Sequence, residues 1–247
     1  MTVQSSPYVG PRSLAVPWTL WDIAKALALV VVGTIAFNLL AIVAAHAILQ
    51  PGQDYEDSAA SYTILLISSL VIQELVLLGA AVWFGPRTHG VSLETIWLRR
   101  TDRGSWWFPL AVASAALVIA HLYAPLLSLA GIEIEAATQP KVSSEAGPLL
   151  VTVLGAVLMA PIMEEVFFRG FLFGGLSSRW GWIAAAVVSS LIFGLAHLSV
   201  DYLPAYAAIG FLFAWSYWRT ASLVPGITAH AITNAVSTAI GFATSVW

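Results

Sequence analysis

The stretch GPLLVTVLGAVLMAPIMEEVFFRGFLFGGL, from Gly147 to Leu176, decides the fold class of this chain. It is apolar over more than the ~20 residues that a helix needs to cross the hydrocarbon of a bilayer. Three charged side chains, those of Glu164, Glu165 and Arg169, interrupt it. On insertion scales a charge at the centre of a bilayer costs about 2.5–3.5 kcal/mol, so each of the three needs a structural or a chemical reason to be there.

The composition extends this interpretation to the whole chain. Of its 247 residues, 59% are hydrophobic and only 9% are charged, whereas a soluble domain carries about 25% charged residues. We therefore expect a multi-pass integral membrane protein, in which many of the eleven Trp anchor helices at the interface. The net charge of −3 argues against a nucleic-acid partner, and the absence of Cys excludes thiol chemistry.

The apolar segments predict an all-α, polytopic transmembrane helix bundle of about seven spans. We expect a polar N-terminal tail over residues 1–22 and a single bundle over 23–247. A short interfacial helix is expected over Val91–Arg100, with Ser92 as its cap. The spans are expected near residues 23–49, 62–85, 105–130, 148–176, 181–200, 203–218 and 222–245.

The distribution of Lys and Arg predicts the orientation of the bundle. With the N-terminus inside and seven spans, the basic residues outside the membrane gather on the inner side, and only Lys141 falls outside. Basic residues mark the cytoplasmic side of membrane proteins, so we expect the N-terminus inside and the C-terminus outside. The inner residues are Arg12, Lys25, Arg87, Arg99, Arg100, Arg103, Arg179 and Arg219.

The two glutamates of the opening stretch are predicted to differ. Glu165 and Arg169 are four residues apart, share a helix face and can pair. Glu164 is rotated by about 100° and has apolar residues at i+3 and i+4. We expect it to face a cavity, to meet a donor from another helix, or to carry a proton. Pro161 frees a carbonyl and can kink the helix beside it. The structural alternative is that both acids only hold helices together.

Later spans add three polar residues in apolar settings: His197, His230 and Asn234. His230 and Asn234 are four apart and share a helix face. At 1.5 Å rise per residue, His197 falls nearer the outer end of its span than His230 does in its own. Glu74, beside Gln73, is a further carboxylate inside a predicted span, and it could pair with Arg169 or a histidine.

These residue types are the parts needed to hydrolyse an amide without a nucleophilic Ser or Cys. A carboxylate within reach of a histidine can activate water as a general base. A second histidine and an asparagine can donate hydrogen bonds to an oxyanion. Two His and one Glu also match a catalytic zinc site with an open water position, with Glu164, His197 and His230 as ligands. We favour water activation by Glu and His, and a divalent metal such as zinc stays open as the alternative.

Three motifs in chain order resemble the CPBP family, the CAAX protease and bacteriocin-processing (Abi) family that includes the type II CAAX prenyl endopeptidases. They are Glu164-Glu165-x-x-x-Arg169, Phe193-x-x-x-His197 and His230-x-x-x-Asn234. The resemblance implies an intramembrane endopeptidase of a bacterial plasma membrane, with its catalytic core over residues 146–247. It implies that Glu164 and His197 activate the water. It assigns the oxyanion hole to His230 and Asn234.

The same resemblance implies supporting roles for Glu165, Arg169 and Phe193. It implies that the partners are the lipid bilayer and a peptide or membrane-protein substrate. It does not indicate which substrate is cleaved or what the oligomeric state is. Two other classes of function stay open. One is a non-catalytic immunity or scaffold protein of the same fold, which has no need of four costly polar groups. The other is a proton-coupled transporter, against which no internal repeat is visible.

Overall fold

The computed structural model describes residues 15–50, 52–54, 58–96, 106–134 and 145–245. Within these ranges the regular structure is helical and there is no strand, which confirms the predicted all-α class. Of the predicted interfacial helix, the described part forms only η4 (Leu93–Thr95), where the Ser92 hydroxyl accepts a hydrogen bond from the Glu94 N–H. The remainder of that helix lies outside the described residues, as do Arg12, Arg99, Arg100, Arg103 and Lys141.

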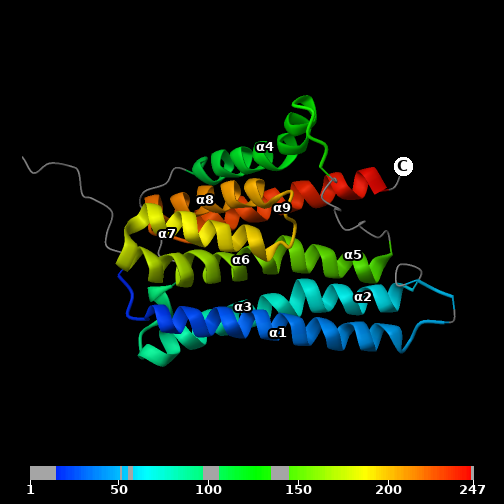
Figure 1. Cartoon of the computed structure of the whole chain (residues 1–247), viewed down its shortest axis with the longest axis horizontal. Helices are drawn as coiled ribbons and strands as arrows, with labels where there is room; N and C mark the ends of the chain where they lie inside the picture. Colours follow the sequence, from blue (N-terminus) through cyan, green and yellow to red (C-terminus); the bar gives the residue numbers. More distant parts are fainter. Residues whose placement is uncertain (1–14, 51, 55–57, 97–105, 135–144, 246–247) are drawn as a thin grey trace, which may run out of the picture.

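The first half of the bundle is a pair of long helical rods that lie side by side (Figure 1). The first rod is α1 (Leu20–His46), which starts at a capping box between the side chains and backbone N–H groups of Thr19 and Asp22. The second rod contains two π-helical segments. It consists of α2 (Ala59–Ile67), η2 (Ser68–Ile72), α3 (Gln73–Val82) and η3 (Trp83–Arg87).

The second half begins with the stretch that opened the sequence analysis, and that stretch packs against both α2 and α3. It is one continuous helical run, again with two π-helical segments. The run consists of α5 (Ala146–Thr152), η5 (Val153–Met159), α6 (Ala160–Glu164) and η6 (Glu165–Phe173). It continues into α7 (Gly174–Ala196), within which Gly181 has a φ of +76°. Glycine adopts this conformation without strain, and here it separates two helical rods.

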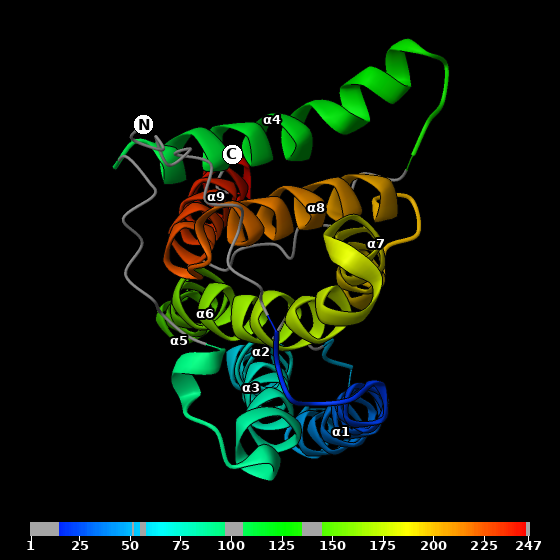
Figure 2. The same ribbon diagram turned by 90° about the vertical axis from the view of Figure 1, so that its left-hand side faces the viewer.

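Three further helices close the bundle. They are α4 (Phe108–Leu129), α8 (Leu203–Thr220) and α9 (Val224–Ser245). Figure 2 shows α4 lying over α8 and α9, with its C-terminal end projecting away from them. Helices α7 and α8 pack closely because Gly194 has no side chain: a Cβ there would lie 2.8 Å from Cδ1 of Leu203. This contact brings the end of α7 against the first turns of α8.

Among the described residues, four helices or joined helical runs are long and apolar enough to cross a membrane. They are Leu20–His46, Ala59–Arg87, Phe108–Leu129 and Ala146–Ala196, the last with 51 residues. The first three correspond to the first three predicted spans. The fourth contains the predicted fourth and fifth spans, divided at Gly181. Helices α8 and α9 are not among these candidates, so length and composition do not confirm the predicted count of about seven spans.

Candidate active site

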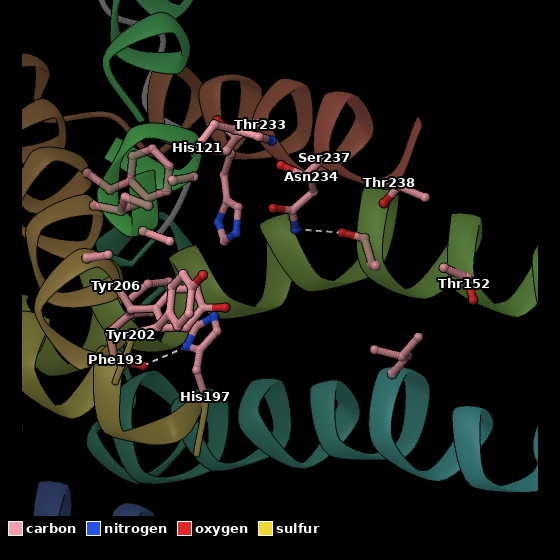
Figure 3. A pocket seen from close by; sticks show the side chains of 18 residues that line it. His121, Thr152, Phe193, His197, Tyr202, Tyr206, Thr233, Asn234, Ser237 and Thr238 are labelled. Carbon is pink, nitrogen blue, oxygen red and sulfur yellow. Dashed lines mark hydrogen bonds between the residues drawn. The ribbon is translucent and has the colours of Figure 1, made fainter. Parts of the chain in front are cut away.

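A cavity of about 450 Å³ lies between the second half of the bundle and η2. Helices α4, α7, α8 and α9 contribute most of its lining, and α5 and η5 close one side (Figure 3). Three of the four predicted catalytic residues line it together: His197, His230 and Asn234. The predicted supporting residue Phe193 lines it as well. The structure thus gathers around one space side chains that are far apart in the sequence.

Glu164 stands next to this cavity rather than in its lining. Its carboxylate oxygen Oε2 lies 3.8 Å from Nε2 of His230, and its side chain is 15% exposed. That same Oε2 is buried and has no hydrogen-bond partner among the described residues. Glu164 therefore has a free acceptor, as expected for a carboxylate that meets a group from another helix.

His230 lies between the two glutamates. Its Nδ1 is 3.2 Å from Oε1 of Glu165, while its Nε2 faces Glu164. The ring of Phe213 stacks on the imidazole, with centroids 5.0 Å apart. Ionised carboxylates only accept hydrogen bonds, so a protonated imidazole can donate at both nitrogens here. The position of His230 near the start of α9 thus connects the first family motif with the third.

Glu165 and Arg169 form the ion pair that their spacing predicts. Nη1 of Arg169 lies 2.8 Å from Oε1 of Glu165, and both side chains are almost fully buried. Nη2 of Arg169 donates to the carbonyl oxygen of Gly210. The guanidinium also lies over the rings of Phe193 and Phe213, at 4.4 and 5.3 Å from their centroids. Such cation–π contacts help to stabilise a charge that has left water, so the pair links η6 to α7 and α8.

His197 is the C-cap residue that directly follows α7, so it lies at the end of this helix. Its Nδ1 lies 2.9 Å from the carbonyl oxygen of Phe193. A carbonyl oxygen only accepts, so Nδ1 carries the hydrogen, and in the neutral ring Nε2 keeps its lone pair. The ring of Tyr206 stacks on the imidazole at a centroid distance of 4.1 Å, and Figure 3 shows both rings at the cavity. His197 is thus oriented to accept a proton through Nε2.

Asn234 follows His230 by one turn of α9. Its Nδ2 donates a hydrogen bond of 2.8 Å to the carbonyl oxygen of Ala156 in η5. A side-chain amide has two N–H groups, so one donor and the amide oxygen stay available to the cavity. The contact with Ala156 fixes the direction of that second donor.

The structure does not bring every predicted partner together. Among the described residues, no hydrogen bond or ion pair joins Glu164 to His197, and the histidine within 4 Å of Glu164 is His230. Nor do the described residues contain a group of three His, Asp or Glu side chains that could hold a metal ion. The expected ligand set of Glu164, His197 and His230 does not fit a metal in this arrangement, and we derive no step through one.

Sequence reasoning missed two aromatic residues that position the histidines. It also suggested that Glu74 could pair with Arg169 or a histidine, and no such ion pair is present among the described residues. Tyr206 and Phe213 stack on His197 and His230, respectively. Tyr206 and Phe213 share one face of α8 with Tyr202, the residue that caps this helix. This aromatic face is the sequence pattern that could have identified them. Glu74 is buried in α3 and interacts electrostatically with Glu164.

Residues 146–236 match the family described as type II CAAX prenyl endopeptidase Rce1-like. All three motifs lie within this segment, and the match confirms the resemblance that they carry. Among curated proteins, one similar relative is the "Putative membrane peptidase YdiL" of Bacillus subtilis, which is 38% identical over 90 residues, 36% of each chain.

Two further relatives have lower sequence identity to this chain. The membrane-embedded CAAX protease MroQ of Staphylococcus aureus is 29% identical over 137 residues, which is 51% of this chain and 55% of MroQ. The UPF0177 protein YxdF of Lactococcus lactis is 28% identical over 83 residues, 33% of this chain and 44% of YxdF. The chain thus spans between about a third and a half of the lengths of these relatives. No solved structure matches it at a significant level.

Proposed function

We propose that this protein is an intramembrane endopeptidase that hydrolyses a peptide bond in a membrane-associated protein or a small processed peptide. The observation that carries this function is the arrangement of His197, His230 and Asn234 around one cavity, with the free carboxylate oxygen of Glu164 beside His230. The names of two relatives, a membrane peptidase and a membrane-embedded CAAX protease, point the same way.

For this intramembrane peptidase we propose a chain that crosses the plasma membrane about seven times, with its N-terminus on the inner side. The tail over residues 1–22 precedes a single bundle over 23–247, of which 146–247 is the catalytic core. The four apolar runs, the division at Gly181 and the packing of α8 and α9 beside them support this count. The Lys and Arg distribution supports the orientation.

The reaction begins with a water held between Glu164 and Nε2 of His197. Glu164 takes one proton from the water, and Nε2 of His197 accepts a hydrogen bond from its other O–H, as the water oxygen attacks the carbonyl carbon of the scissile bond. Negative charge then forms on the former carbonyl oxygen. The free N–H of Asn234 and Nε2–H of protonated His230 donate hydrogen bonds to it. The proton taken from the water passes to the amine nitrogen as the carbon–nitrogen bond breaks, which leaves the site as it began.

The lining of the cavity indicates the kind of peptide that enters. It combines aromatic rings with Thr and Ser hydroxyls, and the described lining contains no Asp, Glu, Lys or Arg side chain. A charged side chain would lose its water there, and the charged groups that it could meet, protonated His230 and the adjacent Glu164, are already used in the reaction. We therefore expect uncharged residues on both sides of the scissile bond, whether or not the substrate carries a lipid.

The direct test uses purified protein in proteoliposomes and a library of peptides with uncharged central residues. Wild type should cleave a subset, and Glu164→Gln should abolish cleavage. Glu94→Gln, which changes an exposed glutamate in η4, is the matched control and should cleave like wild type. Full activity of Glu164→Gln would overturn the function, and an unchanged cellular role of that variant would favour the immunity or scaffold alternative.

A further inference from the structure

One buried acid takes no part in the reaction described above. Glu74 lies in the first turn of α3, is 3% exposed, and has a buried Oε2 without a hydrogen-bond partner among the described residues. An ionised carboxylate in such a place is costly unless it is paired. Its presence therefore needs an explanation that packing does not supply.

The position of Glu74 connects it to the proposed base. Helix α3 packs against both α6 and η6, and Figure 1 shows it beside α6. Glu74 interacts electrostatically with Glu164, the last residue of α6. Oε2 of Glu164 is likewise buried and without a partner. Two carboxyl groups from different helices thus each carry an unsatisfied oxygen in the same region.

The charges around this pair do not balance if every acid is ionised. Three carboxyl groups, those of Glu74, Glu164 and Glu165, stand against Arg169 and, when protonated, His230. Helix α1, which also packs on α3, has no ionisable side chain between Lys25 and His46. At least one carboxyl group must therefore be neutral for the region to reach zero net charge.

The contacts indicate which acid is neutral. Glu165 already has two partners, the Arg169 guanidinium and Nδ1 of His230, so it does not need a proton of its own to be paired. Glu164 must be ionised to act as a base. Neighbouring carboxyl groups in a dry site share a proton rather than both ionise. Glu74 is the acid that is left to hold it.

We propose that Glu74 is a positioning residue: it holds a proton at neutral pH and donates its O–H to Glu164. This hydrogen bond would satisfy Oε2 of Glu74 and one lone pair of a Glu164 oxygen, and it would fix the Glu164 carboxylate beside His230 and the water. The role rests on the proposed peptidase function, but the proton on Glu74 can be measured without any substrate.

The kinetic test compares two uncharged replacements of similar size. Glu74→Gln keeps an N–H donor, so kcat should stay within about threefold of wild type. Glu74→Met fills the same space without a donor, and kcat should fall by about tenfold or more with KM unchanged, as expected for a lost hydrogen bond to a charged group. Glu94→Gln and Glu94→Met are the matched controls. Equal kcat for Glu74→Gln and Glu74→Met would overturn the positioning role.

The second test is infrared spectroscopy of wild type and Glu74→Gln in a detergent without ester groups. Wild type should show the carbonyl stretch of a protonated carboxylic acid at neutral pH, and Glu74→Gln should lose it while Glu94→Gln keeps it. Spectra without this difference would overturn the inference, even if Glu74→Met fails to fold. A wild type that shows the band but cleaves no peptide would contradict the proposed function and leave the protonated acid established.

Discussion

Two groups of polar residues lie within a few ångströms of each other, and they differ in how their polar atoms are used. The charge cluster, defined as Glu165, Arg169 and His230, joins its members by ion pairs within a buried region. The cavity set, defined as Glu164, His197 and Asn234, has each member at or beside the cavity with a donor or acceptor left over. Oε2 of Glu165 and Nη1 of Arg169 also lack a hydrogen-bond partner among the described residues, so the two groups differ in their ion pairs and in their access to the cavity. Paired buried charges connect helices, whereas polar groups at a cavity are available for chemistry.

The largest effect should follow from breaking the charge cluster. Arg169→Met removes the guanidinium partner of the buried Glu165 and leaves it only His230, which should lower the free energy of unfolding by about 3–5 kcal/mol. Thermal unfolding in detergent measures this, with the exposed Arg219→Met as control. Because Glu165→Gln removes the stranded charge, the double variant should recover part of the loss. An Arg169→Met protein as stable as the control would show that the pair does not hold the bundle together.

Asn234→Ala should affect the reaction rather than the fold. Loss of one oxyanion donor should reduce kcat by about 10²–10³, with little change in the unfolding temperature. Ser237→Ala, which changes another polar residue of the same cavity and helix, is the control and should cleave nearly as well as wild type. If the two variants cleaved equally, Asn234 would have no place in the oxyanion hole.

A smaller effect is expected from the aromatic residue that orients His197. Tyr206→Leu removes the stacked ring, and an aromatic contact of this kind is worth about 0.5–1.5 kcal/mol. We expect kcat to fall by about two- to tenfold. Tyr202→Leu changes a second tyrosine of the cavity whose described ring contacts are with other tyrosines, and it should have less effect. The reverse order would show that stacking does not position His197.

The smallest effect should come from removing metals. Since the described residues contain no metal-binding group of three His, Asp or Glu, treatment with a zinc chelator should leave kcat within about twofold of the untreated enzyme. Loss of activity that added zinc restores would instead establish metal-dependent hydrolysis.

The spacing of residues along the sequence predicted the features that depend on a single helix. The all-α class and the Glu165–Arg169 pair follow from the period of the helix, and the shared face of His230 and Asn234 agrees with their place in one cavity. The match over residues 146–236 likewise confirms what the ordered motifs indicated.

Contacts between different helices could not be predicted from the spacing of residues along the sequence. That Glu164 meets His230 rather than His197 depends on how α9 lies against α6 and on the end of α7. The π-helical segments change which residues share a face, and no single residue in them signals the change. The span count was also uncertain, because helices with polar side chains toward a cavity have a lower hydropathy than helices that face lipid only.

The difference between adjacent glutamates tests the comparison most directly. We would measure kcat and the free energy of unfolding for Glu164→Gln and Glu165→Gln side by side. Glu164→Gln should lose about 10²–10⁴ in kcat, as expected for a general base, and keep the stability of wild type. Glu165→Gln should lose about 3–5 kcal/mol of stability, because it strands the buried Arg169. Retained cleavage by Glu164→Gln would contradict the assignment of Glu164 as the base.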